Sequence, residues 1–380
     1  MKKTLRPFAE PIYVTRPLLP DLQQVMEKLQ GIWERKWLTN WGPSYMELEE
    51  KLRQTLRAQQ LSLFNNGTIA LLAACKAMKL HGEVVTTPFT FAATPHVLQW
   101  CGVTPVFADI DPETMNLDPD GAAAVITPET SGVVPVHVFG TPCDLEGFAK
   151  LTRERSLALV YDAAHAFGVE IDGKGIGSFG DISMFSFHAT KTFHTVEGGA
   201  LAFQDPELVT QINWLKNFGI QSEEEVVASG INGKMNEVQA AIGLLVLDMV
   251  EEARNKRTKL METYRRCLAG VSGVKLPPLP AAGVKSNSQY CVLRLDEAEF
   301  GISRDVAHQK LKEYNVITRK YFYPLCSNFA CYRQLPSAAP ERLPVANKVA
   351  QQVLSMPLYS DLEVQDVERI CEMLLACAQQ

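Results

Sequence analysis

One lysine of this sequence follows a strand-like apolar run and lies in a polar turn. Residues 182–187 form the run, Lys191 lies in the turn, and a Glu-Gly-Gly segment then opens another apolar run. A lysine at the end of a buried strand is a candidate for covalent chemistry with a carbonyl compound. A solvated surface lysine is the commoner explanation for such a position, so the assignment depends on the rest of the chain.

An aspartate upstream of the lysine strengthens this interpretation. Asp162 ends the apolar run 157–161, and in open α/β sheets ligands bind at the carboxyl ends of the strands. A buried carboxylate without a cationic partner costs on the order of several kcal/mol, so a partner is expected. That partner is either an arginine or lysine of the protein or the protonated ring nitrogen of a cofactor.

Further residues could bind a phosphate and an aromatic ring. Gly67 and Thr68 open an apolar helix, whose free N–H groups and positive dipole end suit a phosphate, although threonine is also an ordinary N-cap. Ser186 could bind the same phosphate, and Phe91 could stack on a ring. With the lysine and the aspartate, these are the groups that pyridoxal 5'-phosphate requires.

The elements that must position these residues alternate between strands and helices. Strand-like runs separated by helical segments predict βαβ units and a mostly parallel sheet; the runs lie at residues 61–64, 83–86, 105–109, 133–139 and 158–161.

The character of the chain changes after about residue 270. A Pro-rich linker at residues 277–280 precedes a predicted strand, 289–295, and a long helix from residue 235 to 260 leads into this region. We expect two domains: residues 1–250, an N-terminal arm and a large cofactor-binding domain, and residues 251–380, a smaller α/β domain.

Composition excludes several classes of function. The 380 residues carry a net charge of −6, with 46% hydrophobic and 21% charged residues. They form no basic stripe for nucleic acid. The nine cysteines are dispersed without metal-ligand spacing, which indicates reduced thiols and no metal site. No signal peptide or run of 18 apolar residues is visible, so we expect a cytoplasmic protein with no membrane segment.

Two segments, YDAAHAFG and GDISMFSFHATKTFHTVEGGALAF, closely resemble the DegT/DnrJ/StrS family of sugar aminotransferases, which are fold-type I pyridoxal-phosphate enzymes. The resemblance extends through FNNGTIALLAA, TPFTFAAT and GINGKMNEVQAAIGL over nearly the whole chain. It implies an α/β fold with a large domain, whose mostly parallel seven-stranded sheet lies between helices, and a smaller C-terminal α/β domain.

The resemblance implies a role for each residue that matches a family motif. Lys191 matches the Schiff-base lysine, and Asp162 matches the aspartate on the pyridine nitrogen. His165 matches a Gln or His near the cofactor's phenolic oxygen, the alternative being a structural histidine. Gly67, Thr68 and Ser186 match the phosphate-binding residues, and Phe91 matches the stacking aromatic residue.

One further match to the family implies an oligomeric state. Asn232, in GINGKMN, matches an asparagine that reaches the phosphate of the neighbouring subunit, so a homodimer with shared active sites is expected. Lys234 stands where many relatives have arginine, which weakens the case for a bidentate contact there.

Candidate substrate contacts are less specific. Arg319 and Tyr321 could contact the substrate or could belong to a polar face of the small domain. His188, three residues before the lysine, could line the site or pack.

The expected activity is therefore transfer of an amino group from L-glutamate to a nucleotide-linked keto-sugar. By resemblance, the conversion of dTDP-4-keto-6-deoxy-D-glucose to dTDP-4-amino-4,6-dideoxy-D-glucose, for a surface polysaccharide such as the O-antigen of lipopolysaccharide, is favoured. Amination at the sugar 3-position or on a UDP-sugar, another fold-type I reaction such as deamination or dehydration, and a non-catalytic regulator are the alternatives.

Overall fold

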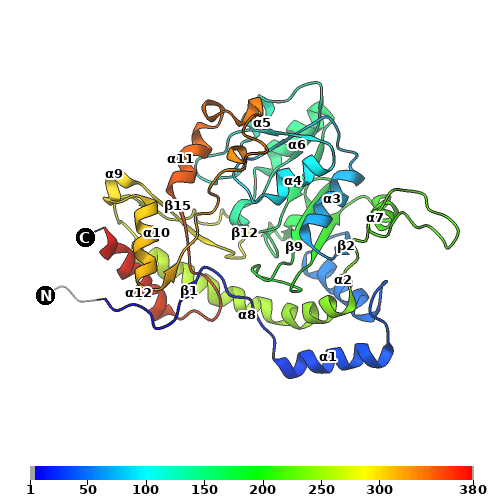
Figure 1. The fold of residues 1–380 in the computed structure, drawn as a ribbon, viewed down its shortest axis with the longest axis horizontal. Coiled ribbons are helices and arrows are strands. Elements are labelled where there is room, and N and C mark those ends of the chain that lie inside the picture. Colours follow the sequence, from blue (N-terminus) through cyan, green and yellow to red (C-terminus); the bar gives the residue numbers. More distant parts are fainter. Residues whose placement is uncertain (1–4, 379–380) are drawn as a thin grey trace.

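The structure is a computed structural model and describes residues 5–378. Two packed units lie side by side and are joined by the long helix α8, Glu237–Leu268 (Figure 1). Asn236 and Gln239 form a capping box at the start of α8, which explains why the helix begins two residues later than expected. Its end, eight residues beyond the predicted one, reaches into the small unit.

A seven-stranded sheet forms the centre of the large unit, in the order β2-β10-β9-β6-β5-β3-β4. All neighbouring strands are parallel except at β10, which runs antiparallel to β2 and β9. This confirms the expected mostly parallel seven-stranded sheet. The strands are β2 Gln60–Phe64, β3 Glu83–Thr86, β4 Thr104–Phe107, β5 Thr130–Val134, β6 Ala158–Asp162, β9 Ile182–Ser186 and β10 Gly199–Phe203.

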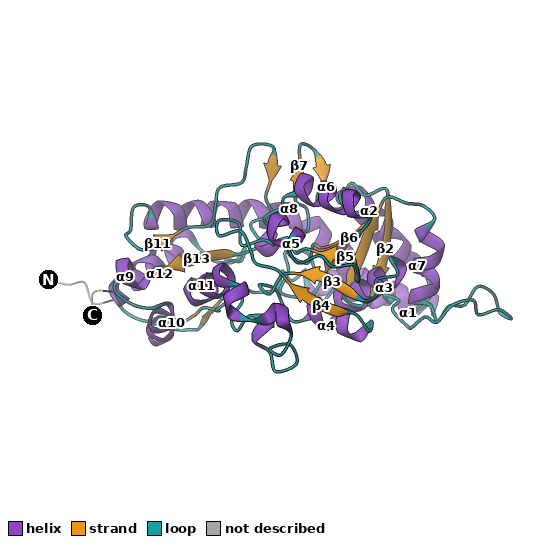
Figure 2. Cartoon of the chain, turned by 90° about the horizontal axis from the view of Figure 1, so that it is seen from above, coloured by secondary structure: helices purple, strands orange, loops and turns teal. Residues whose placement is uncertain are grey.

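Helices cover both faces of this sheet, as Figure 2 shows for the view from above. They bury the two faces of the sheet in separate apolar clusters, so its strands read as continuous apolar runs. The helices of the large unit are α1 Leu22–Arg35, α2 Pro43–Thr55, α3 Gly67–Ala77, α4 Ala93–Trp100, α5 Pro119–Ala123, α6 Leu145–Arg155 and α7 Leu208–Lys216, with 3₁₀ turns at Val138–Gly140 and Ile176–Ser178.

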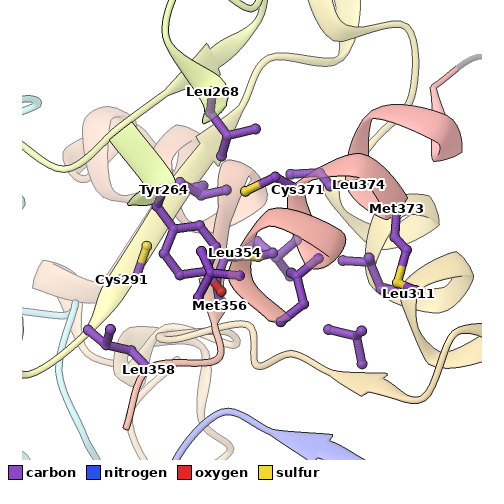
Figure 3. Packing of buried hydrophobic residues seen from close by; sticks show 14 of the residues in the cluster. Tyr264, Leu268, Cys291, Leu311, Leu354, Met356, Leu358, Cys371, Met373 and Leu374 are labelled. Carbon is purple, nitrogen blue, oxygen red and sulfur yellow. The ribbon is translucent and has the colours of Figure 1, made fainter. Parts of the chain in front are cut away.

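The small unit is a three-stranded antiparallel sheet covered by helices. Its core gathers side chains from α8, the sheet and the last helix, including Tyr264, Leu354 and Cys371 (Figure 3). The elements are β11 Val274–Lys275, β13 Cys291–Leu295, α9 Glu297–Phe300, α10 Arg304–Glu313, α11 Pro344–Gln352, β15 Val353–Met356 and α12 Val364–Cys377, with 3₁₀ turns at Cys326–Asn328, Pro336–Ala338 and Pro340–Arg342.

Two short pairings connect distant parts of the chain. The N-terminal arm contributes β1, Ile12–Tyr13, which pairs in parallel with β14, Val316–Ile317, of the small unit. Strand β12, Val284–Lys285, pairs with β7, Glu170–Ile171, which also forms a hairpin with β8, Lys174–Gly175, across the Asp172-Gly173 turn. The domain division at residues 250 and 251 stays a prediction.

Three predicted strands are wrong in their extent. The run 105–109 is a strand only to Phe107. The run 133–139 is a strand only to Val134, because Pro135 has no N–H for the ladder and Phe139 turns into the left-handed region with φ 56°. The predicted strand 289–295 begins at Cys291, because Gln289 bonds to the turn of Lys191 and the Tyr290 ring packs on His165 and Phe139 instead.

Neither a membrane-crossing helix nor a candidate metal cluster is present among residues 5–378. No helix there is both long and apolar enough to cross a membrane, and no group of three or more His, Cys, Asp or Glu could hold a metal ion.

Candidate active site

Asp162 and Lys191 come from neighbouring strands of the central sheet. Asp162 is the last residue of β6, and β6 pairs in parallel with β9, which leads into the turn of Lys191. Parallel strands end at the same edge of a sheet. The two side chains are close enough for each charge to act on the other's pKa.

The Asp162 carboxylate is buried and hydrogen-bonded on both oxygens. Thr94 Oγ1 donates to Oδ2 at 2.8 Å, and the backbone N–H of Ala164 donates to Oδ1 at 3.0 Å. Burial raises the pKa of Asp162, while these two donors and the charge of Lys191 oppose the rise. Among residues 5–378 no arginine bonds to this carboxylate, and both of its hydrogen bonds come from uncharged donors.

The Lys191 amine is tuned by burial. Desolvation lowers its pKa to about 8, and the charge of Asp162 limits the fall. Its Nζ lies 6.0 Å from the centroid of the Tyr290 ring. A lysine with this pKa is partly neutral at physiological pH, so it can act as a nucleophile or a base.

His165 lies in an aromatic layer next to these two residues. Its ring is parallel to the rings of Phe139 and Phe322, with centroids 6.1 and 5.9 Å away, and Tyr290 meets it edge-on at 5.1 Å. Burial, with the charge of Lys191, lowers the pKa of His165 well below its usual range. The ring is therefore neutral at physiological pH.

The predicted phosphate-binding residues form a tight backbone cradle. A Cβ atom on Gly67 would lie 3.0 Å from Ser186 Cβ, and one on Gly199 would lie 2.8 Å from Gly67 Cα. Asn66 caps α3 by accepting from the N–H of Ile69 at 2.8 Å. Glycine at these two positions therefore lets the start of α3 pack closely against the end of β9.

Thr68 and Phe91 lie open at the same edge. Thr68 is exposed in the first turn of α3, and Phe91 is 64% exposed in the loop between β3 and α4. The Phe91 carbonyl accepts from the N–H of Thr94, the residue that holds Asp162. Both side chains are thus free to contact a ligand.

The candidate substrate contacts lie around this centre at different depths. The Tyr321 ring lies 5.9 Å from that of Tyr290, and the Arg319 charge acts on the Tyr321 hydroxyl. The Arg319 backbone pairs with Ser355 at the edge of the small sheet. His188 is half exposed; its Nε2 lies 3.5 Å from Glu197 and its Nδ1 bonds to the Thr190 hydroxyl.

Asn232 lies at the surface near the Gly67 turn. It is exposed, and its backbone carbonyl accepts a long 3.5 Å hydrogen bond from Asn65, just before the Gly67 turn. Lys234 donates to the Asn217 side chain at 2.5 Å and lies over the Phe218 ring. Lys234 thus makes a single-point contact in place of a bidentate one.

Sequence reasoning missed several buried polar residues of the site. Asn287, Gln289 and Tyr290 enter it from the small unit, and Thr94 enters from α4. Thr94 lies in the quoted TPFTFAAT motif, which could have drawn attention to it. The other three carry no local signal, because their partners are more than 90 residues away.

The whole arrangement suits one kind of ligand. A glycine-lined helix start for an anionic group, an aromatic face, a buried carboxylate without a strong cation and a partly neutral lysine converge at one sheet edge. Such a ligand carries a phosphate, a flat ring with a protonatable nitrogen and a carbonyl group.

Comparisons with known proteins agree with this geometry. The sequence profile of the DegT/DnrJ/EryC1/StrS aminotransferase family matches residues 21–375. A dTDP-4-amino-4,6-dideoxy-D-glucose transaminase of Escherichia coli is 44% identical over 96% of this chain and 98% of its own length. One of Shigella dysenteriae is 42% identical over 95% of this chain and 97% of its own length. The crystal structure of DesI in the presence of its TDP-sugar product has a TM-score of 0.93 and 40% identity, over 99% of this chain and 95% of DesI.

Proposed function

This chain belongs to the DegT/DnrJ/EryC1/StrS aminotransferase family and is a transaminase, and we propose from that premise that it converts dTDP-4-keto-6-deoxy-D-glucose to dTDP-4-amino-4,6-dideoxy-D-glucose. The amino donor is L-glutamate. The reaction takes place in the cytoplasm and supplies an amino-sugar for a surface polysaccharide such as an O-antigen. The observation that carries this proposal is the 44% identity over nearly full length to a transaminase of that name, together with an intact Lys191 and Asp162.

The site residues fit pyridoxal 5'-phosphate. Lys191 would hold it covalently through Nζ, Asp162 would face its ring nitrogen, and Phe91 would cover its ring. Gly67, Thr68 and Ser186 would bind its phosphate. When bound, the cofactor supplies a carbonyl that takes up the amino group and a ring that accepts electrons from the donor's α-carbon.

The chain's own residues then have separate tasks. The Asp162 carboxylate, held by Thr94 and Ala164, keeps a protonated ring nitrogen in place. Lys191 moves a proton at Nζ, and its pKa of about 8 lies near the operating pH, where a general base is most effective. His165, which is neutral and packs against Phe139 and Phe322, would orient the cofactor ring through a hydrogen bond and exclude water from that side.

Exposed apolar side chains support a homodimer. They lie on α1, just after it, and on the loop after α7, and both regions project from the body of the chain (Figure 1): Leu22, Met26, Trp33, Trp37, Phe218 and Ile231. Large apolar groups exposed on projecting segments often mark a surface for another protein chain. We assign this surface to a second copy of the chain, to which Asn232 is also presented.

Incubation with a substrate panel tests the proposed reaction. The purified chain, pyridoxal phosphate and L-glutamate are combined with dTDP- and UDP-linked 4-keto and 3-keto sugars, and the amino-sugar is identified by NMR. We expect amination at carbon 4 of the dTDP-sugar. Preferred turnover of a 3-keto or UDP-linked sugar would assign the substrate to that alternative.

Substitution of the lysine tests the chemistry. Lys191→Ala should bind the cofactor without the covalent bond and lose turnover, by at least about 1,000-fold. Wild-type rates in this variant would overturn the assignment of Lys191, and a wild-type protein that takes up no cofactor would overturn the enzyme assignment.

A further inference from the structure

The turn that carries Lys191 has no regular secondary structure. Residues 187–198 form bends and turns between β9 and β10, and the Lys191 N–H bonds locally to the His188 carbonyl at 2.9 Å. Phe193 anchors the turn further along by packing on Phe167 and Phe187. The backbone on either side of the lysine needs another partner if its position is to be fixed.

That partner comes from the small unit, about 100 residues away in sequence. The Gln289 side-chain oxygen accepts from the Thr192 N–H at 3.1 Å, and its amide nitrogen donates to the Thr190 carbonyl at 3.4 Å. The buried side-chain amide of Gln289, a residue that is 1% exposed, thus hydrogen-bonds to the backbone on both sides of Lys191. In the described part of the chain, no other side chain from outside the turn hydrogen-bonds to the backbone of Thr190 or Thr192.

Gln289 is itself held rigidly. Arg257 of α8, which is buried, donates from Nε to the Ser288 carbonyl at 3.0 Å and from Nη2 to the Gln289 carbonyl at 2.6 Å. The Asn287 side chain accepts from the Gln289 N–H at 3.1 Å and donates to the His165 and Phe167 carbonyls at 2.8 and 3.0 Å.

Residues 286–290, which we call the strap, therefore contact both catalytic turns. They hold the turn of Lys191 through Gln289 and that of His165 through Asn287, and the Tyr290 ring lies near both side chains. The strap continues directly into β13 of the small sheet, so a short segment connects the small unit to the turn of Lys191 through the hydrogen bonds of Gln289.

We propose that Gln289 is a positioning residue for Lys191: its amide fixes the peptides on both sides of the lysine and so aims Nζ at the carbonyl it must attack. The inference rests on the proposed function, since it concerns the covalent bond between Lys191 and pyridoxal phosphate. Gln289 touches neither the reacting atoms nor the ligand; it acts through the backbone of Thr190 and Thr192. A displacement of a reacting group by about 1 Å can cost roughly 100-fold in rate.

Gln289→Met tests the proposal, because it keeps the length of the side chain and removes both polar atoms. Cofactor-free protein is mixed with pyridoxal phosphate and quenched with borohydride at intervals, and the fraction of modified Lys191 peptide is measured by mass spectrometry. We expect covalent trapping and kcat to fall in parallel, by roughly 10- to 100-fold, while the KM for glutamate changes by less than about threefold. The matched control is Gln352→Met, whose amide bonds to Arg294 and Asp296 inside the small unit and should leave the trapping rate unchanged.

Circular dichroism and thermal unfolding give the folded fraction for each variant. Gln289→Asn, an amide shorter by one methylene, is the second variant, and slower trapping by a folded protein is expected there too. Trapping at the wild-type rate in a folded Gln289 variant would overturn the proposal. So would failure of both Gln289 variants to fold while Gln352→Met folds, because Gln289 would then have a purely structural role. If the wild-type chain traps no cofactor on Lys191, the proposed function fails instead, so the two failures are distinguishable.

Discussion

The backbone N–H of Phe139 donates a hydrogen bond to Nδ1 of His165 at 3.2 Å. An amide N–H can only donate, so Nδ1 is the unprotonated nitrogen and the neutral ring carries its hydrogen on Nε2. Phe139 reaches this position because its φ is 56°, and Gly140, with φ 88°, continues the turn where a Cβ would lie 2.9 Å from the His165 carbonyl. The turn thus makes His165 a donor at Nε2.

This relationship predicts how His165 can be replaced. Glutamine at this position also offers an N–H donor, so His165→Gln should keep kcat within about tenfold of wild type. His165→Phe should lose roughly 100-fold in kcat, because it removes a hydrogen bond to the charged phenolic oxygen of the cofactor. Because the pKa of His165 lies well below its usual range, the ring should not titrate near neutral pH. The pH profiles of kcat for wild type and His165→Gln should share one acid limb, and a limb near pH 6.5 present only in wild type would contradict this.

Thr94 should support cofactor binding through Asp162. Its hydroxyl donates to the carboxylate and lowers the pKa of Asp162, which burial raises. Without it, the carboxylate protonates more readily as the pH falls and loses its attraction for a ring cation. Thr94→Val should weaken pyridoxal phosphate binding by roughly tenfold, more at pH 6 than at pH 8, and Asp162→Asn should weaken it more at both values.

Absorbance titration measures these affinities, with Thr94→Ser, which keeps the hydroxyl, as the control. Equal affinities for Thr94→Val and Thr94→Ser at pH 6 would show that the hydroxyl does not act through the carboxylate.

Asn232 allows a test of shared active sites. In a mixture of Lys191→Ala and Asn232→Ala chains, a hybrid dimer contains one site with an intact lysine and an intact asparagine, provided that Asn232 serves the partner's site. Each variant alone should be impaired, and mixing after mild dissociation should restore up to about one quarter of wild-type activity, the statistical share of such sites under random exchange. Activity no higher than the sum of the separate variants would place the action of Asn232 in its own subunit.

Lys216 should make stability depend on pH. Its Nζ is buried and donates to Tyr45 Oη at 2.8 Å and to Ser62 Oγ at 2.6 Å, and burial lowers its pKa from 10.5 to about 8. Between about pH 8 and pH 10.5, Lys216 is therefore protonated in the unfolded chain and neutral in the folded chain. The Lys216 contribution to the free energy of unfolding therefore rises with pH in this window, by at most about 1.4 kcal/mol per pH unit.

Urea titrations of wild type and Lys216→Met at about pH 8 and about pH 9.5 measure this contribution. The quantity to compare is the difference in unfolding free energy between the two proteins. Buried cysteines with a raised pKa, such as Cys291 and Cys371, make the unfolding free energy fall with pH in both proteins, and this effect cancels in the difference. A difference that stays constant with pH would mean that Lys216 keeps its charge in the folded state.

The sequence by itself determined the local pieces of the site. Asp162 and Lys191 could be found because each follows an apolar run that reads as a buried strand, and Gly67 because a glycine opens an apolar helix. These signals lie within a few residues of the groups they concern, and periodicity and strand ends depend on local chemistry. The alternation of strands and helices likewise predicted a mostly parallel sheet.

The tertiary structure decided which distant residues complete the site. Gln289 lies where a strand was expected, yet it bonds to the turn of Lys191, and the N-terminal arm pairs with β14 of the small unit. The tautomer of His165 depends on the left-handed φ of Phe139, inside a run that also reads as a strand. Such contacts join segments far apart in the chain, and a buried amide or backbone N–H bonds to whatever group the packed fold brings to it. No local sequence pattern identifies that partner. Only the folded structure shows that Gln289 bonds to the turn of Lys191, a lysine that the sequence had already identified as a candidate.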